Sequence, residues 1–219
     1  LQNMAFTDSI NTYCVKNGAV PPFLALDQEG GYVNRLKNIS GPLPSEERVA
    51  LSLSSEQAFQ LYSLQAVQMK ALGFHMNLAP VAEVCTEQNA AFLDGRSFGA
   101  ADAVALYGAA AVNGYASGGI AAVLKHFPGN TNTDPHTGLP EIPLSAAGVE
   151  NTVVVPFRNL FAYDAAAVLM SHARMACADE KIPACLSRFW VTETLRNRMG
   201  FTGLVFSDEN CRRFTSYGA

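Results

Sequence analysis

The stretch Ile-Ala-Ala-Val-Leu at residues 120–124 runs directly into Lys125 and His126. A continuous apolar run of this length is typical of a parallel strand that is buried on both faces. A lysine and a histidine at the end of such a strand are side chains able to bind a ligand or to transfer a proton. The stretch therefore predicts a buried strand whose carboxyl end lies at a functional site.

Four other apolar runs have the same character. Each ends on polar or ionisable side chains, and they lie at residues 23–26, 76–81, 166–170 and 203–206, shortly before Asp27, Glu83, Ser171 and Ser207 respectively. Helix-like segments lie before the first run and between the runs, at residues 3–16, 54–72, 100–117, 145–163 and 188–199. A strand followed by a helix, repeated along the chain, predicts a parallel α/β architecture.

Several residues mark where the expected helices begin and end. Ser54, three residues before Gln57, has the pattern of a capping box at a helix start. Gly73 and Gly200 stand where a helix commonly ends on a left-handed residue. Pro156 is expected to interrupt the helix over residues 145–163, because proline has no backbone N–H to donate.

Two parallel α/β designs compete at this point. A doubly wound sheet often has a glycine-rich phosphate turn after its first strand, and no Gly-x-Gly-x-x-Gly follows residues 23–26. A (β/α)8 TIM-type barrel places its chemistry at the carboxyl ends of the strands, and all five expected strands end on suitable residues. The sequence therefore favours the barrel. Since such a barrel has eight strands and five are visible, we expect residues 1–219 to be a single catalytic barrel domain truncated at both ends.

The composition is that of a globular protein, with 49% hydrophobic residues and a net charge of −4 over 219 residues. That charge gives no electrostatic reason to expect nucleic acid or an anionic membrane as a partner. No apolar run is long enough for a transmembrane segment. The five cysteines are far apart and lack metal-ligand spacing, which favours free thiols in a reducing compartment and predicts no metal or other cofactor.

Asp134 and His136 lie two residues apart in the polar loop that follows Lys125 and His126. An aspartate in this position can hold the imidazole in one tautomer and stabilise its protonated form, which suits His136 to general acid/base catalysis. A polar loop whose side chains only make turn hydrogen bonds explains the same residues equally well. The residues alone leave both interpretations open.

Three other polar groups are expected at the same face. Asp208, in Ser207-Asp208-Glu209, is a possible nucleophile towards an anomeric carbon, although taken alone it is better explained as a helix cap. Asp27 is placed to accept hydrogen bonds from sugar hydroxyls. Arg35 alone is better explained as a surface arginine, and Arg96 adds one more hydrogen-bond donor near this face.

These stretches together resemble the family-three glycoside hydrolases. The branch they resemble is the bacterial β-N-acetylhexosaminidases that remove N-acetylglucosamine from peptidoglycan fragments. The matching stretches occur in the family's order and cover nearly all of residues 20–209: LALDQEGGYVNRL, GFHMNLAPVAEV, GRSFGA, KHFPGNTNTDPH, VLMSHARM and GFTGLVFSDE.

The resemblance implies a role for each matching residue. Asp208 matches the catalytic nucleophile, His136 the general acid/base, and Asp134 the partner of that histidine. The positions that match residues holding the non-reducing sugar are Asp27, Arg35, Arg96, Lys125 and His126. The implied reaction is hydrolysis with retained configuration through a covalent glycosyl-enzyme, without a cofactor.

The sequence departs from the family pattern in three places. The loop between His126 and His136 is two residues shorter than usual, and Glu83 replaces the usual aspartate, for which we expect only a modest change in loop packing. The two strands that the family has before residue 1 and the strand that it has after Asp208 are not visible, and residues 210–217 do not resemble the family's helix.

Other interpretations therefore remain. The protein is alternatively another family-three β-glycosidase, a glycoside phosphorylase that uses phosphate in place of water, or an inactive truncated fragment. A carbohydrate is the expected partner, and the sequence does not predict the oligomeric state. The unpaired cysteines favour the cytoplasm, while export or lipid anchoring stays open because the family's N-terminal segment is missing.

Overall fold

The computed structural model describes residues 2–133, 140–143, 145–179 and 181–207. At its centre is a parallel sheet in which every strand pairs with the next one along the chain. Its five strands are β1 (Ala25–Leu26), β4 (Met76–Asn77), β5 (Ala121–Phe127), β7 (Ala167–Met170) and β9 (Leu204–Ser207). This sequential order is that of a barrel wall, whereas a doubly wound sheet reverses its order at a switch point. The predicted barrel-type α/β fold is confirmed.

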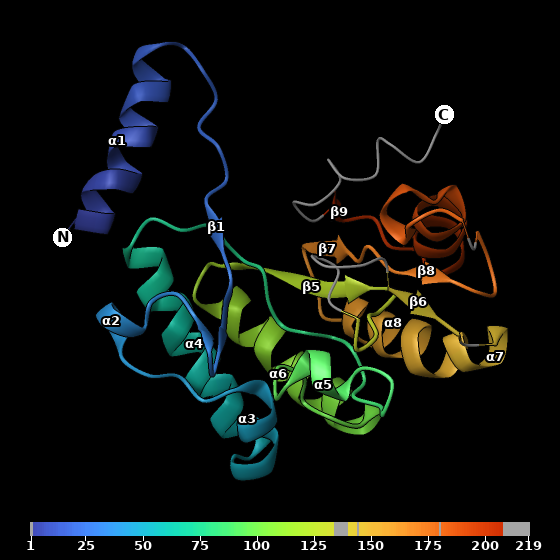
Figure 1. Ribbon diagram of the computed structural model, residues 1–219. Helices are drawn as coiled ribbons and strands as arrows, with labels where there is room; N and C mark the ends of the chain where they lie inside the picture. The colour runs from blue at the N-terminus through green and yellow to red at the C-terminus, as the bar shows by residue number, and fades with distance from the viewer. Residues whose placement is uncertain (1, 134–139, 144, 180, 208–219) are drawn as a thin grey trace.

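Each connection between neighbouring strands of this sheet contains a helical segment. These segments are α4 (Ser55–Ala71), α6 (Ala101–Ser117), the consecutive α7 (Ala146–Val149), η1 (Glu150–Val154) and α8 (Val155–Phe161), and η3 (Phe189–Arg198). Figure 1 shows α4, α6 and α8 on one side of the sheet, as in the outer layer of a barrel. None of the described helices is long and apolar enough to cross a membrane.

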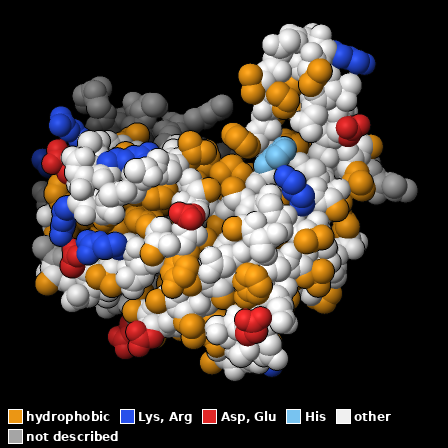
Figure 2. Space-filling model, turned by 180° about the vertical axis from the view of Figure 1, so that it is seen from behind, with side chains coloured by type: hydrophobic (Ala, Val, Ile, Leu, Met, Phe, Trp, Pro, Cys, Tyr) orange, Lys and Arg blue, Asp and Glu red, His pale blue; other side chains and the backbone are white. Residues whose placement is uncertain are grey.

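The remaining elements are short or lie outside the sheet. The shorter helices are α2 (Lys37–Ser40), α3 (Glu46–Ser52), α5 (Ala90–Leu93) and η2 (Ala184–Leu186). Two small sheets pair β2 (Gln28–Gly30) with β3 (Val33–Asn34) and β6 (Glu141–Ile142) with β8 (Arg174–Met175). Helix α1 (Gln2–Lys16) projects from the rest of the molecule in Figures 1 and 2, with exposed side chains that include Phe6 and Tyr13. It contacts the end of α4 through Thr7, whose hydroxyl donates to the Leu72 carbonyl at 2.9 Å.

The predicted helix boundaries have visible causes in the structure. The Ser54 hydroxyl accepts from the Gln57 backbone N–H, and the Gln57 side chain accepts from the Ser54 N–H, so the capping box at the start of α4 is complete. Gly73 and Gly200 follow their helices with φ of 87° and 70°, which favours glycine. The predicted interruption near Pro156 is a π-helical segment, η1, immediately before α8.

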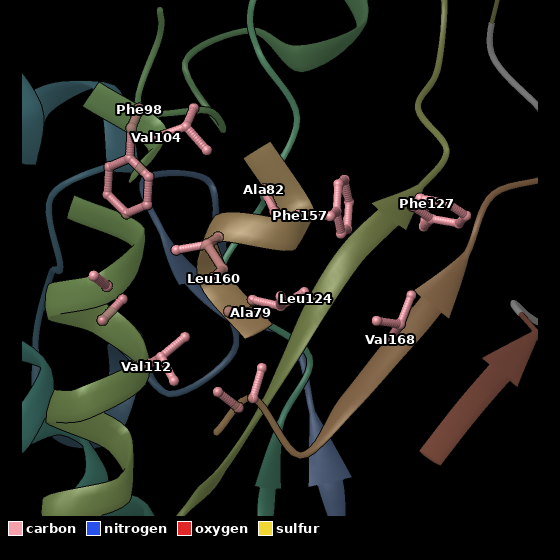
Figure 3. Packing of buried hydrophobic residues seen from close by; sticks show 14 of the residues in the cluster. Ala79, Ala82, Phe98, Val104, Val112, Leu124, Phe127, Phe157, Leu160 and Val168 are labelled. Carbon is pink, nitrogen blue, oxygen red and sulfur yellow. The ribbon is translucent and has the colours of Figure 1, made fainter. Parts of the chain in front are cut away.

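The three central strands β4, β5 and β7 are buried on both faces, as their continuous apolar runs predicted. The prediction was wrong for the outer strands β1 and β9, whose residues are exposed or only partly buried because each has a described neighbouring strand on one side only. The larger hydrophobic cluster lies between the strands and the helices and includes Val112, Leu124, Phe127, Phe157, Leu160 and Val168 (Figure 3). A smaller cluster contains Met76, Val123, Ala167 and Leu169. Val123 is next to Leu124 in the sequence, and Ala167 and Leu169 are next to Val168, so the two clusters alternate along β5 and β7. Because successive side chains of a strand point to opposite faces, the smaller cluster lies on the face away from the helices.

Helices α4 and α6 approach each other so closely that only glycine fits at two contacts. A Cβ atom on Gly114 would lie 2.7 Å from the Cβ of Tyr62 and 2.9 Å from the carbonyl oxygen of Phe59. A Cβ atom on Gly118 would lie 2.4 Å from the Cβ of Ala66. These contacts involve backbone and Cβ atoms, which cannot move aside as a flexible side chain would.

We therefore expect Gly114→Ala to destabilise the protein, although alanine has the higher helix propensity by about 1 kcal/mol. Forcing an extra methyl group into a packed interface costs about 1–3 kcal/mol, so the two effects together give a lower urea midpoint. The matched control is Asn113→Ala, one position earlier on the exposed side of α6, which we expect to leave the midpoint the same or slightly higher. Equal midpoints for the Gly114 variant and the wild type would contradict the close contact.

Candidate active site

A cavity of about 850 Å³ runs along the inner face of the sheet and reaches the carboxyl ends of the strands. Its apolar wall comes from strand residues such as Met76, Leu169 and Phe206. Its polar wall comes from side chains at or just after the strand ends. All five residues expected to hold the sugar line this cavity: Asp27, Arg35, Arg96, Lys125 and His126. The parallel strands thus bring Asp27 beside Lys125, which lies 98 positions later in the sequence.

The three residues expected to perform catalysis, Asp208, His136 and Asp134, lie outside the described residues. Ser207, the chain neighbour of Asp208, is the last residue of β9 and lines the cavity. The assignments of nucleophile, acid/base and partner therefore stay predictions.

The centre of the polar wall is a buried cluster of ionic groups. Lys125 Nζ lies 2.6 Å from Asp27 Oδ1 and 2.5 Å from Glu29 Oε1. Arg96 donates two hydrogen bonds to Glu29, from Nε to Oε2 at 2.8 Å and from Nη2 to Oε1 at 2.9 Å. The side chains of Lys125 and Glu29 are only 1% and 2% exposed, whereas that of Asp27 is 36% exposed and remains accessible to a ligand.

Glu29 remains ionised in this buried position. Its burial opposes ionisation, but the positive charge of Lys125 and the hydrogen bonds from Arg96 outweigh that effect and lower the pKa of Glu29 from 4.5 to about 2. Glu29 was not among the residues that the sequence predicted for the site. The sequence held one signal, since Glu29 comes two residues after Asp27. Glu29 lies in β2, which pairs with β3 in an antiparallel ribbon, and its side chain reaches the same wall of the cavity.

A second buried carboxylate lies beside His126. Glu83 Oε1 is 2.6 Å from His126 Nδ1, and Glu83 Oε2 accepts a 2.7 Å hydrogen bond from the backbone N–H of Asn130. The sequence-based expectation for Glu83 concerned loop packing, and the structure shows that its carboxylate also contacts a residue of the cavity wall. Sequence alone gave no signal for this contact, because Glu83 lies in the segment after β4 and His126 lies in β5, 43 residues later.

Phe92 supplies an aromatic part of the wall that sequence reasoning also missed. Its ring lies 5.6 Å from the Arg96 guanidinium carbon and 6.4 Å from the His126 ring, and it lines the cavity.

Arg35 is exposed at the cavity edge. Among the described residues there is no cluster of three or more His, Cys, Asp or Glu side chains able to hold a metal ion.

Comparison with curated proteins identifies relatives along almost the whole chain. The "Beta-hexosaminidase" of Pseudomonas aeruginosa is 32% identical over 214 residues, which covers 95% of this chain and 64% of that protein. The "Beta-hexosaminidase" of Nitrosomonas eutropha is 30% identical and covers 91% of this chain and 60% of that protein. The chain therefore spans slightly less than two thirds of the length of these relatives.

Solved structures give the same result. A glycoside hydrolase family 3 β-N-acetylglucosaminidase from Paenibacillus sp. FPU-7 superposes with a TM-score of 0.89 at 31% identity, covering 94% of this chain and 40% of that one. NagZ from Neisseria gonorrhoeae superposes with a TM-score of 0.88 at 28% identity, covering 99% of this chain and 65% of that one.

The sequential parallel sheet, the cavity at its carboxyl edge and these relatives agree with a match to a family. Residues 2–215 match the family described as "Glycosyl hydrolase family 3 N terminal domain". The resemblance seen in the sequence motifs is confirmed, and the chain belongs to glycosyl hydrolase family 3.

Proposed function

We propose that this protein is a retaining exo-β-N-acetylhexosaminidase that removes terminal N-acetylglucosamine from peptidoglycan-type or related glycosides. The observation that supports it most is the convergence of Asp27, Arg35, Arg96, Lys125 and His126 on one cavity. The names of the relatives support the choice of sugar.

The polar wall suits a ligand rich in hydroxyl groups. A hydroxyl both donates and accepts hydrogen bonds, and the wall offers a carboxylate acceptor at Asp27 beside cationic donors at Lys125 and Arg96. Because Glu29 holds both cations, their positions are fixed before a ligand arrives, and less side-chain entropy is lost on binding. The Phe92 ring adds an apolar surface beside these groups.

The proposed reaction has two displacement steps. Protonated His136, oriented by Asp134, donates its proton to the glycosidic oxygen while Asp208 attacks the anomeric carbon. The bond between the anomeric carbon and the leaving oxygen breaks, and a bond to the Asp208 carboxylate forms. Neutral His136 then takes a proton from water, whose oxygen displaces Asp208. Two inversions at the anomeric carbon leave its configuration retained.

We infer a cytoplasmic location as part of the same proposal. Within the part of the chain that the structure describes, Cys14, Cys85 and Cys177 are free thiols. Unpaired cysteines suit a reducing compartment.

We expect Asp208→Asn to lower kcat for 4-nitrophenyl N-acetyl-β-D-glucosaminide by at least about a thousandfold, because removal of a nucleophile abolishes the covalent step. The matched control is Asp164→Asn, an exposed residue in the turn before β7, at the amino ends of the strands. This control should retain wild-type activity. Full activity of the Asp208 variant would show that the nucleophile is misassigned.

The same assay in phosphate buffer separates two reactions of the family. We expect free N-acetylglucosamine as the sugar product, detected by mass spectrometry. Formation of N-acetylglucosamine 1-phosphate would instead identify a phosphorylase, because phosphate would then replace water in the second displacement.

Glu29→Gln should destabilise the protein in a pH-dependent way. Since the pKa of Glu29 is lowered in the folded state from 4.5 to about 2, its ionisation stabilises the folded state above about pH 4.5, and this contribution is lost as the pH falls towards 2. The pKa shift corresponds to a contribution on the order of 3 kcal/mol. The difference in unfolding free energy between wild type and variant should therefore shrink below pH 4.5. A constant difference would contradict the pairing, and Glu56→Gln, at an exposed site on α4, serves as control.

A further inference from the structure

The Glu83 carboxylate is surrounded by hydrogen-bond donors. Its Oε1 atom lies 2.6 Å from His126 Nδ1 and accepts from Asn130 Nδ2 at 3.0 Å, and its Oε2 atom accepts from the Asn130 backbone N–H at 2.7 Å. The side chain of Glu83 is 2% exposed. An ionised carboxylate can only accept hydrogen bonds, so this environment requires a proton on Nδ1 of His126.

We propose that Glu83 is a positioning residue that fixes the proton of His126 on Nδ1 and so makes Nε2 the ring nitrogen available to a ligand in the cavity. His126 is 7% exposed and lines the cavity. The inference rests on the proposed function in one respect only, namely that this cavity binds the sugar. In neutral His126 the Nε2 atom is then an acceptor, matched to a hydroxyl group that donates.

The same carboxylate also connects two loops. Glu83 follows β4, and Asn130 follows β5 and lines the cavity as well. Asn132 adds a second connection, since its Oδ1 atom accepts from the backbone N–H groups of Ala91 and Phe92. The segment that carries Phe92 and the loop that carries Asn130 are therefore joined by two separate sets of hydrogen bonds.

A Glu83→Gln substitution keeps the shape of this side chain and changes its hydrogen bonding. The backbone N–H of Asn130 cannot become an acceptor, so the remaining oxygen stays there and the new NH2 group faces His126 Nδ1 and the Asn130 side chain. The Asn130 amide can turn its own oxygen towards this NH2 group. The imidazole then relieves the donor–donor conflict by moving its proton to Nε2. With glutamine at position 83, Nε2 of His126 should therefore be a hydrogen-bond donor instead of an acceptor. Glu83→Asp keeps a carboxylate, which only accepts hydrogen bonds.

The first test is the tautomer of His126, read from the two-bond ¹H–¹⁵N spectrum of the protein labelled at histidine. The His126 signals are identified by their loss in His126→Gln. We expect protonated Nδ1 in the wild type, in Glu83→Asp and in the exposed control Glu87→Gln, and protonated Nε2 in Glu83→Gln. An unprotonated Nδ1 in the wild type overturns the proposal whether or not the Gln variant folds, and so does an unchanged spectrum in a folded Gln variant.

The second test is ligand binding. We expect Glu83→Gln to weaken binding of N-acetylglucosamine about tenfold and to raise KM for the 4-nitrophenyl glycoside by a similar factor, with a smaller change in kcat, because one ligand hydrogen bond is lost. Glu83→Asp should recover most of the affinity, and Glu87→Gln should bind as the wild type does. A loss confined to kcat contradicts a role in binding. Because the tautomer does not depend on turnover, a protein without hydrolase activity but with the expected spectra would refute the proposed function and leave the role of Glu83 standing.

Discussion

The ion pair between Lys125 and Glu29 is the contact on which the geometry of the site depends. Both side chains are almost fully buried, and the loss of hydration on burial costs several kcal/mol per ion. That cost is offset because Glu29 also forms a two-point contact with Arg96, and Lys125 also contacts Asp27. Removal of one member would leave an unpaired charge in the interior. The cluster therefore constrains the ends of β1 and β5 and the loop after β4 to a single arrangement.

The sheet makes this cluster possible. Parallel strands in chain order place all their carboxyl ends on the same edge, so polar residues that follow different strands meet there. Helices α4, α6 and α8 cover the face of the sheet that points away from the cavity, and most of the hydrophobic burial lies between these helices and the strands. Two buried carboxylates, Glu29 and Glu83, then order the cationic and imidazole groups at that edge. The scaffold fixes where the strands end, and the carboxylates fix how the side chains point.

The sequence predicted the elements well because their signals are local. The apolar run before Lys125, the capping box at Ser54 and the stop at Gly200 each depend on neighbours within a few residues, and all three were confirmed. The five residues expected to hold the sugar do line one cavity, since strand ends of a parallel sheet must meet, whereas the three expected catalytic residues lie outside the described residues. It did not predict the partners of Glu29, Glu83 and Phe92, because those contacts join residues of β5 to segments that follow other strands. Such contacts depend on loop geometry, for which an amino-acid pattern carries little information.

The pairing of each strand with its predecessor also affects how the chain acquires its structure. Each strand of the central sheet after β1 pairs with a strand one strand-helix unit earlier, so none of these pairings has to wait for a segment made much later. A ribosome releasing this chain from its amino end presents β4 when β1 is already available, and β5 when β4 is. The entropy lost in each loop closure stays similar from one addition to the next, because the successive connections are of comparable length. The order of strand pairing in the sheet thus follows the order in which the strands are synthesised.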